Sequence, residues 1–150
     1  MKLIAHRGNT NGPTRWENEP SYIVDSIKKG FDVEIDVWYV NNEYFLGHDE
    51  PIYKIKKDFL YQEQLWCHAK NPGALQEMNN ADIHCFWHQN DDYTITSKGF
   101  IWSFPNAAYI ANMVVNQPEI YTDLIEFNTN VFAVCSDYVD LLKILDNKHE

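Results

Sequence analysis

Residues 31–39 read FDVEIDVWY and alternate apolar with acidic side chains. Alternate residues of a β-strand share a face, so Glu34 and Asp36 project to the same side of the strand. The apolar residues between them project to the other side, where the helices of an α/β protein pack. The stretch therefore predicts a strand that carries two carboxylates side by side into one space.

Two negative charges held that close repel each other unless a cation lies between them. Carboxylate oxygens are the ligands that hard divalent ions prefer, so we expect Glu34 and Asp36 to bind a metal ion. Mg²⁺ and Ca²⁺ are the first candidates for this ion, and Mn²⁺ is a further one. The alternative is a polar edge strand with both acids in water, but so regular an apolar face normally covers a core.

The rest of the chain alternates short strand-like runs with short helix-like runs, which is typical of α/β proteins with parallel strands. Asn41 and Asn42 predict a tight turn, after which residues 44–47 fold back on the preceding strand. Residues 119–127 fit helix and strand equally well. Further strands are expected at 3–5, 65–70, 82–87, 93–96, 100–104 and 131–135, and helices at 21–29, 72–78, 107–115 and 138–145.

This alternation fits either a (β/α)8 barrel or an open sheet. A barrel usually needs about 200 residues or more. The chain has 150 residues, so a barrel would need trimmed helices or lost units. We therefore expect an α/β fold of a compact or truncated (β/α)8 type with parallel strands.

Composition limits the classes of protein to which the chain can belong. Its 150 residues are 45% hydrophobic, which suits one domain over residues 1–150, and its formal net charge of −10 disfavours a nucleic-acid partner. No stretch approaches the roughly 20 apolar residues of a membrane span, and the N-terminus lacks the apolar region of a signal peptide. We expect a cytoplasmic protein without an integral membrane segment. Cys67, Cys85 and Cys135 lie in apolar runs, which favours buried, reduced thiols.

Several ionisable side chains fall at the carboxyl ends of the expected strands, the edge where α/β folds place their sites. One histidine there is more often an ordinary loop residue, so the convergence carries the argument. His68 can be a metal ligand or a base and Lys70 an anion contact, or the two can be a core histidine and a surface lysine. The candidates at this edge are His6, Arg7, Glu34, Asp36, His48, His68 and Lys70, with His88 and Trp102 as weaker pocket candidates.

Four short elements follow one another in the first 50 residues: IAHRG at 4–8, Glu17-Asn18, EIDV at 34–37 and His48-Asp49. Their order and spacing resemble the opening signature of the glycerophosphodiester phosphodiesterase family. The resemblance implies a (β/α)8 barrel that hydrolyses a phosphodiester. Phosphatidylinositol-specific phospholipases and sphingomyelinase D enzymes use a similar two-histidine site, so the signature leaves the substrate open.

The resemblance also implies roles for single residues. His6 and His48 would be the acid–base pair, and Arg7 would contact the phosphate. Glu34 and Asp36 would be metal ligands. Family members usually carry Glu-x-Lys on the third strand; this chain keeps Lys70 as a phosphate contact and offers His68 as the third ligand. The other pocket candidates are Glu17, Asn18, Asp49, His88 and Trp102.

The sequence thus predicts metal-dependent hydrolysis of a small, glycerophosphodiester-like molecule by two-histidine acid–base catalysis. A second hypothesis is a barrel that binds a phosphorylated sugar or glycerol head group without cleaving it. His68 in place of a carboxylate and the short chain favour binding alone. Retention of both His6 and His48 favours catalysis, because binding needs no acid–base pair. The alcohol groups of the substrate, the identity of the metal and the oligomeric state stay open.

Overall fold

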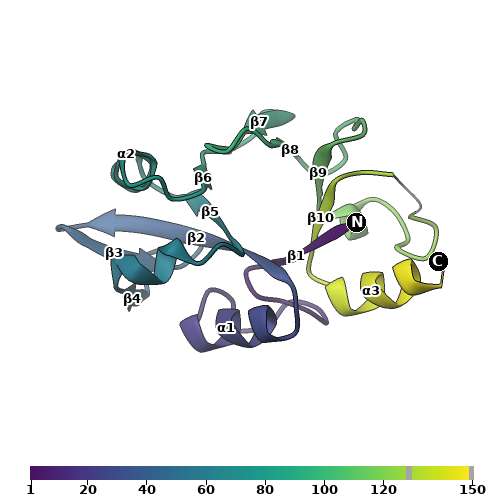
Figure 1. Cartoon of the computed structure of the whole chain (residues 1–150), viewed down its shortest axis with the longest axis horizontal. Helices are drawn as coiled ribbons and strands as arrows, with labels where there is room; N and C mark the ends of the chain where they lie inside the picture. Colours follow the sequence, from purple (N-terminus) through teal and green to yellow (C-terminus); the bar gives the residue numbers. More distant parts are fainter. Residues whose placement is uncertain (128–129, 149–150) are drawn as a thin grey trace.

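The structure is a computed structural model that describes residues 1–127 and 130–148. Its main feature is one strongly curled β-sheet with three α-helices (Figure 1). The strands are β1 (Lys2–His6), β2 (Asp32–Val40), β3 (Glu43–Leu46), β4 (Tyr53–Ile55), β5 (Leu65–Ala69), β6 (Cys85–Phe86), β7 (Tyr93–Ile95), β8 (Ile101–Ser103), β9 (Met113–Asn116) and β10 (Ala133–Ser136). The helices are α1 (Pro20–Lys28), α2 (Pro72–Asn80) and α3 (Val139–Asn147), with short 3-10 helices η1 (Lys57–Tyr61) and η2 (Pro118–Ile120).

Parallel pairing joins the strands in the order β6, β5, β2, β1, β10, β9 and β8. Antiparallel pairing adds β3 beside β2, β4 beside β3, and β7 beside β8. The carboxyl ends of the parallel strands therefore meet at one edge, as the sequence predicts. This edge carries the candidate site.

The predicted (β/α)8 barrel is wrong. In the part of the chain that the structure describes, ten strands of mixed orientation form a curled half-barrel, and strand and helix do not alternate eight times. Among the described residues, a helix lies between β1 and β2 and between β5 and β6, whereas β8 and β9 are joined by a loop. A chain of 150 residues is too short to supply a helix for each crossover.

The helix predicted over residues 107–115 is also wrong. Residues 113–116 form β9, which pairs with β8 and β10. Asn106, just before the predicted helix, and Asn112, within it, have left-handed backbones with φ of 65° and 71°, so a helix cannot run through Asn112. The β-branched Val114 and Val115 then favour the strand. In the ambiguous region 119–127, the structure has the end of η2 followed by turns.

The helix expected over residues 21–29 and the turn expected at Asn41-Asn42 are confirmed. The side chain of Glu19 accepts a hydrogen bond from the Tyr22 N–H at the start of α1, and Pro20 occupies the first turn, as in many helices. Asn41 and Asn42, with φ of 51° and 62°, form the tight turn between β2 and β3. Turn chemistry set these boundaries locally.

The two faces of β2 divide as the alternation predicts. Val33, Ile35 and Val37 are fully buried on the outer face. They share one apolar cluster with Ile23 of α1 and Met78 of α2. Burial of a side chain of this size contributes about 1.5–3 kcal/mol, so this layer anchors the strand with Glu34 and Asp36 turned inward.

The interior of the half-barrel is filled by a second apolar cluster. Its centre is aromatic, with the rings of Phe86 and Trp102 stacked at a centroid distance of 4.6 Å. The second cluster consists of Ile4, Trp66, Phe86, Trp102, Val114, Ala133 and Cys135.

The three cysteines are free and buried, as expected from their apolar surroundings.

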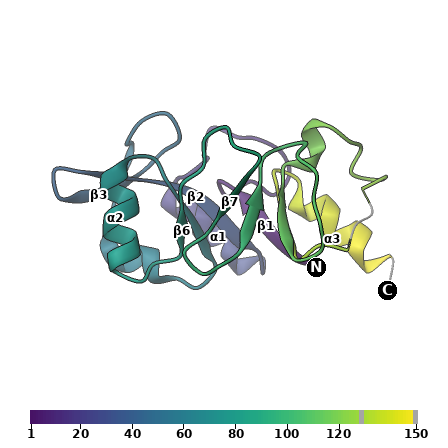
Figure 2. The same ribbon diagram turned by 90° about the horizontal axis from the view of Figure 1, so that it is seen from above.

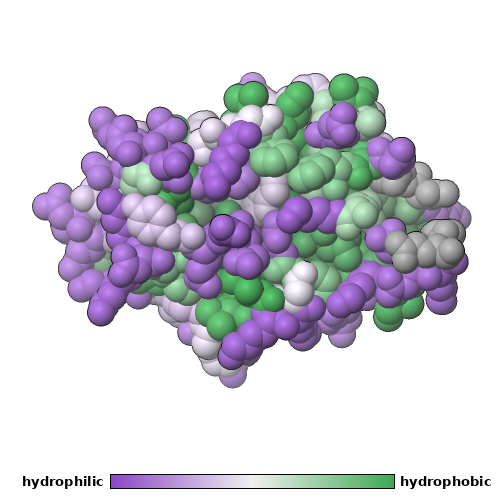
Figure 3. Space-filling model, viewed as in Figure 1, coloured by the Kyte–Doolittle hydropathy of each residue, from purple (hydrophilic) through white to green (hydrophobic). Residues whose placement is uncertain are grey.

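The helices cover only part of the sheet. In Figure 1, α1 and α3 lie at the bottom of the molecule and β7 at the top. Figure 2, seen from above, shows β7 in front of α1 with no helix of the described chain drawn over β7. Ile95 and Ile101, paired across β7 and β8, are 65% and 38% exposed. Figure 3 shows apolar surface at the top of the view, in the region of these strands. None of the described helices has the length and apolar character needed to cross a membrane.

The buried His84 makes the stability of the fold depend on pH. Its ring packs on the ring of Trp66, with the two ring centroids 4.5 Å apart, and its Nε2 lies 2.8 Å from Thr96 Oγ1. Burial and the charge of Lys98 lower the pKa of His84 to about 4. The unfolded chain therefore binds this proton more readily than the folded protein between pH 6.5 and about 4.

We expect the free energy of unfolding to fall as the pH falls through this window, with a contribution from His84 of at most about 1.4 kcal/mol per pH unit. Urea unfolding at pH 7, 6 and 5 measures the slope. The His84→Gln variant should show a shallower slope, because glutamine does not titrate. Equal slopes for the two proteins would exclude His84 as the cause.

Candidate functional site

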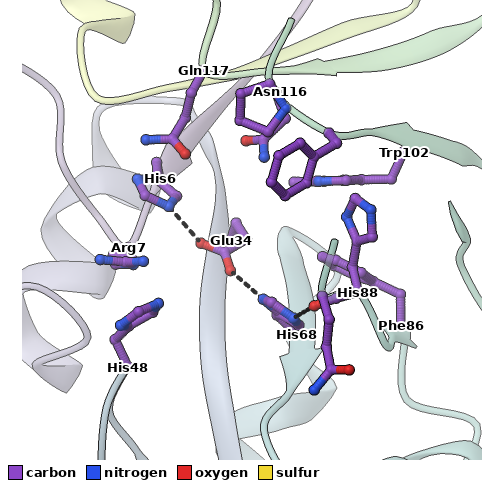
Figure 4. Close-up of a pocket in the computed structure, with 13 residues that line it drawn as sticks. His6, Arg7, Glu34, His48, His68, Phe86, His88, Trp102, Asn116 and Gln117 are labelled. Carbon is purple, nitrogen blue, oxygen red and sulfur yellow. Dashed lines mark hydrogen bonds and ion pairs between the residues drawn. The ribbon is translucent and has the colours of Figure 1, made fainter. Parts of the chain in front are cut away.

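A cavity of about 210 Å³ opens at the carboxyl ends of the parallel strands (Figure 4). One wall carries ionisable side chains from β1, β2 and β5, and the opposite wall is largely aromatic. The lining residues are His6, Arg7, Glu34, His48, His68, Phe86, His88, Gln89, Trp102, Phe104, Pro105, Asn116 and Gln117.

Glu34, Asp36 and His68 form a cluster that has the donor atoms of a metal site. One donor atom from each of the three residues lies within 4.8 Å of the others. His68 Nδ1 is 3.6 Å from Glu34 Oε1 and 3.4 Å from Asp36 Oδ1. The two acids are only 3% and 1% exposed. These are the three ligands that the sequence analysis singled out, and the parallel pairing of β2 with β5 brings them together.

Two observations show that this cluster fits a cation. Glu34 Oε2 and Asp36 Oδ1 are buried and accept no hydrogen bond, and such orphaned acceptors are costly. His68 Nε2 lies 2.8 Å from the carbonyl oxygen of His88, so this nitrogen carries the proton and donates it. That hydrogen bond leaves Nδ1 as the nitrogen that faces the acids, as in histidines that bind metals.

The spacing of the cluster suits a single divalent ion. Its three donor atoms lie within 4.8 Å of one another, so one cation can contact all three, and two carboxylates are ligands that Mg²⁺ and Ca²⁺ prefer. An imidazole ligand also suits Mn²⁺ and Zn²⁺.

Without an ion, positive side chains neutralise the acids. The neighbouring Asp36 and Glu34 outweigh burial and raise the pKa of His68 to about 9. Burial opposes ionisation of Asp36, but His68 and Arg7 lower the pKa of its carboxyl below the usual range. A metal ion would therefore displace a proton from His68 on binding.

Asn18 and Arg7 hold Asp36 in place. Asn18 Nδ2 donates to Asp36 Oδ2 at 2.9 Å, and the Asp36 N–H donates to Asn18 Oδ1 at the same distance. Arg7 Nε is 3.2 Å from Asp36 Oδ2, and Arg7 Nη1 donates to Glu17 Oε2 at 3.1 Å. The Glu17-Asn18 element thus orients the guanidinium and the carboxylate of the site.

The turn that delivers Arg7 has an unusual backbone. Arg7 and Asn18 have φ of 54° and 66°, a region that costs non-glycine residues about 1 kcal/mol or more. Gly8 follows with φ of 88°, and a Cβ there would lie 2.9 Å from the ring of Tyr22. This strained turn directs the Arg7 side chain into the cavity.

His6 is held by an acid that the sequence analysis did not assign to the site. Its Nδ1 lies 2.8 Å from Asp137 Oδ1, and its Nε2 lies 3.8 Å from Glu34 Oε2. Burial lowers the pKa of His6, but the hydrogen bond to Asp137 and the charge of Glu34 outweigh it and raise the pKa. Asn9 Nδ2 also donates to Asp137 Oδ1, at 2.9 Å. The ring of His6 therefore has a fixed orientation with Nε2 toward the cavity.

His48 reaches the same cavity from another direction. It follows β3, which the Asn41-Asn42 turn folds back along β2. Its Nδ1 lies 2.7 Å from Asp49 Oδ1, and its side chain is 41% exposed. Figure 4 shows His6 and His48 on either side of Arg7. The sequence analysis predicted this convergence from residues 42 positions apart.

The other predicted residues divide between the cavity and its surroundings. His88 and Trp102 line the cavity. Asp49 contacts His48, but its side chain is 92% exposed. Lys70 follows β5 and is not among the described residues that line the cavity, so its predicted phosphate contact has no support from this geometry.

Sequence reasoning missed several residues of the site. Asp137 directly follows β10 and Asn116 ends β9, so the strand-end argument applied to His6 would have found both. Gln117 also lines the cavity, and its backbone is left-handed with φ of 46°. No pattern in the sequence indicated either feature. No pattern in the sequence pointed to the loop residue Gln89 as part of the cavity either.

No protein-family model, curated protein or solved structure matches this chain. The assignment of a function therefore depends on the chemistry of the site. The likeness to the glycerophosphodiester phosphodiesterase signature enters only as a proposal.

We expect Ca²⁺, Mn²⁺ or Mg²⁺ to raise the melting temperature, because an ion that binds only the folded state stabilises it. At 100 times the dissociation constant the gain is about 2.7 kcal/mol, or roughly 5–10 °C for a chain of this size. Differential scanning fluorimetry in EDTA and in millimolar metal measures the shift. Asp36→Asn should abolish it, and Asp25→Asn on the exposed face of α1 should preserve it. A shift of equal size in both variants would place the ion elsewhere.

Proposed function

We propose that the protein hydrolyses a small-molecule phosphodiester with the help of a divalent metal ion. The observation that carries this proposal is the convergence of four groups on one cavity. These are the His6–Asp137 pair, the Arg7 guanidinium, the cluster of Glu34, Asp36 and His68, and His48. The family that the sequence resembles uses the same kinds of group for this reaction.

Attack on a phosphodiester adds negative charge to the phosphoryl oxygens, which positive groups stabilise. A metal ion held by Glu34, Asp36 and His68 would supply such charge next to the phosphate. Arg7 lies at the cavity wall and contributes a second, permanent positive charge. Its contacts with Glu17 and Asp36 orient the guanidinium before substrate binds.

The two histidines suit the two proton transfers of the reaction. His6 donates its Nδ1 proton to Asp137, so its Nε2 can accept a proton from water or from a neighbouring substrate hydroxyl. His48, at the more exposed side of the cavity, can protonate the departing alkoxide.

The cavity also limits the size of the substrate. Its volume of about 210 Å³ is below the roughly 300–1,000 Å³ of pockets for drug-sized ligands. The apolar wall of Phe86, Trp102 and Phe104 lies opposite the charged wall, and Gln117 adds an amide. A phosphate with a small alcohol, such as a glycerophosphodiester, fits these dimensions and this polarity.

Activity is tested with glycerophosphodiesters, cyclic phosphodiesters and bis(p-nitrophenyl) phosphate in the presence of Mg²⁺, Ca²⁺ or Mn²⁺. His6→Ala and His48→Ala should each lower the rate by about 100-fold or more, because each removes one proton transfer. EDTA should abolish turnover. Unchanged melting temperatures would show that both variants fold, and Asp25→Asn serves as the control with full activity. A folded His6→Ala variant with wild-type turnover would remove His6 from the mechanism.

One observation favours binding without hydrolysis as a second candidate function. Arg7 and His68 both lie within ion-pair distance of Asp36, and His68 Nδ1 is also 3.6 Å from Glu34 Oε1, so both acids of the cluster have a positive partner without a metal. A pocket of this kind can hold a phosphorylated sugar or glycerol head group. Saturable binding of glycerol 3-phosphate in calorimetry, with no product from any diester, would support binding over catalysis.

A further inference from the structure

Glu119 is a partly buried acid that the proposed reaction does not use. It lies in η2, the short helix that follows β9 and the cavity residue Gln117. Its Oε1 accepts a hydrogen bond from the Asp137 N–H at 2.7 Å, and its Oε2 accepts one from Ser136 Oγ at 3.0 Å. Both carboxylate oxygens thus hold the segment that leaves β10.

This segment is the one that presents Asp137 to His6. The carboxylate of Asp137 accepts from His6 Nδ1 and from Asn9 Nδ2. Its backbone N–H donates to Glu119, and its carbonyl oxygen accepts from the Gly12 N–H at 2.8 Å. Asp137 is therefore fixed on its amino side by Glu119 and on its carbonyl side by the loop after β1.

Glu119 occupies this position at an electrostatic cost. Burial and the nearby charge of Asp137 raise the pKa of the Glu119 carboxyl, although its hydrogen bonds oppose the shift. An acid placed beside another acid costs stability unless its hydrogen bonds compensate. The two short bonds to residues 136 and 137 supply that compensation.

The Glu119 carboxylate also joins the segment after β9 to the end of β10. Gln117 lines the cavity, and its N–H donates to the Cys135 carbonyl oxygen at 2.7 Å. The contacts of Gln117 and Glu119 with residues 135–137 tie the chain after β9 to the end of β10. Loss of the Glu119 contacts would leave the Asp137 segment without its bond from the η2 side.

We propose that Glu119 is a positioning residue. Its carboxylate holds the backbone N–H of Asp137, and this contact aligns the Asp137 carboxylate so that it can orient the ring of His6. The catalytic consequence rests on the proposed hydrolase function. The alignment itself does not depend on that function. An error of about 1 Å in a catalytic group can cost roughly 100-fold in rate, so a backbone contact of this kind can control turnover.

Kinetics of matched variants test the catalytic consequence. Glu119→Ala should lower kcat by roughly 10–100-fold with KM within about threefold, because proton transfer is impaired while substrate contacts remain. Glu119→Gln should retain activity within about threefold, because its side-chain oxygen still accepts from the Asp137 N–H and its amide can donate to Ser136. Glu126→Ala, on the exposed surface of the same loop, is the control. Equal losses in the Gln and Ala variants, or no loss in either, would overturn the proposal.

Proton NMR tests the alignment without any assay of turnover. The proton shared by His6 Nδ1 and Asp137 should give a low-field signal, which His6→Gln assigns by its disappearance. The signal should persist in Glu119→Gln and Glu126→Ala and vanish in Glu119→Ala. If Glu119→Ala does not fold, Glu119→Asp is used instead. The aspartate side chain is shorter, so its carboxylate cannot keep the 2.7 Å hydrogen bond that Glu119 accepts from the Asp137 N–H.

A low-field signal unchanged in the folded Ala or Asp variant refutes the positioning role, whatever substrates the protein cleaves. If the signal is lost as expected but no phosphodiester is hydrolysed by the wild type, the proposed hydrolase function fails and the alignment stands. The two proposals are therefore tested separately.

Discussion

The placement of two buried carboxylates on the inner face of β2 is the constraint on which the site depends. Val33, Ile35 and Val37 lie under the helices, so the pleat of the strand forces Glu34 and Asp36 into the half-barrel. A shift of one residue would bury the acids under the helices and expose the valines. The apolar layer therefore determines where the charges lie, and its burial compensates for the cost of bringing them together.

The groups around these acids offset the cost of burying two negative charges close together. Asn18, Arg7 and His68 provide hydrogen bonds and positive charge for Asp36. Two carboxylate oxygens, Glu34 Oε2 and Asp36 Oδ1, still accept no hydrogen bond, and the carbonyl of His88 keeps His68 Nδ1 directed at the two acids. Asp137 lies outside this cluster and orients His6, so the proposed metal site and the proposed proton transfer depend on different acids. Such a division suits a site in which one group must stay charged while another exchanges a proton.

The main difference between expectation and structure lies in the outer layer. Strand and helix runs along the chain favoured a barrel, and the parallel order of the central strands is present. Residues 107–115 were expected to supply a helix but lead into β9, because Asn112 within them has a left-handed backbone. Without helices between β6 and β9, that part of the sheet has one uncovered face, and the antiparallel β7 occupies the edge. Helix propensity in so short a segment was too weak to decide the outcome.

Local chemistry in the sequence determined the strand parity of β2, the turn at Asn41-Asn42, the start of α1 and the residue types that meet at the strand ends. These features depend on neighbours a few residues apart, where the pleat and turn preferences act directly. Only the tertiary structure decided that Asp137, 131 positions from His6, is its partner, that Lys70 does not line the cavity, and that the sheet curls without closing as a (β/α)8 barrel. Those outcomes depend on the packing and register of distant strands, which no short stretch of sequence encodes.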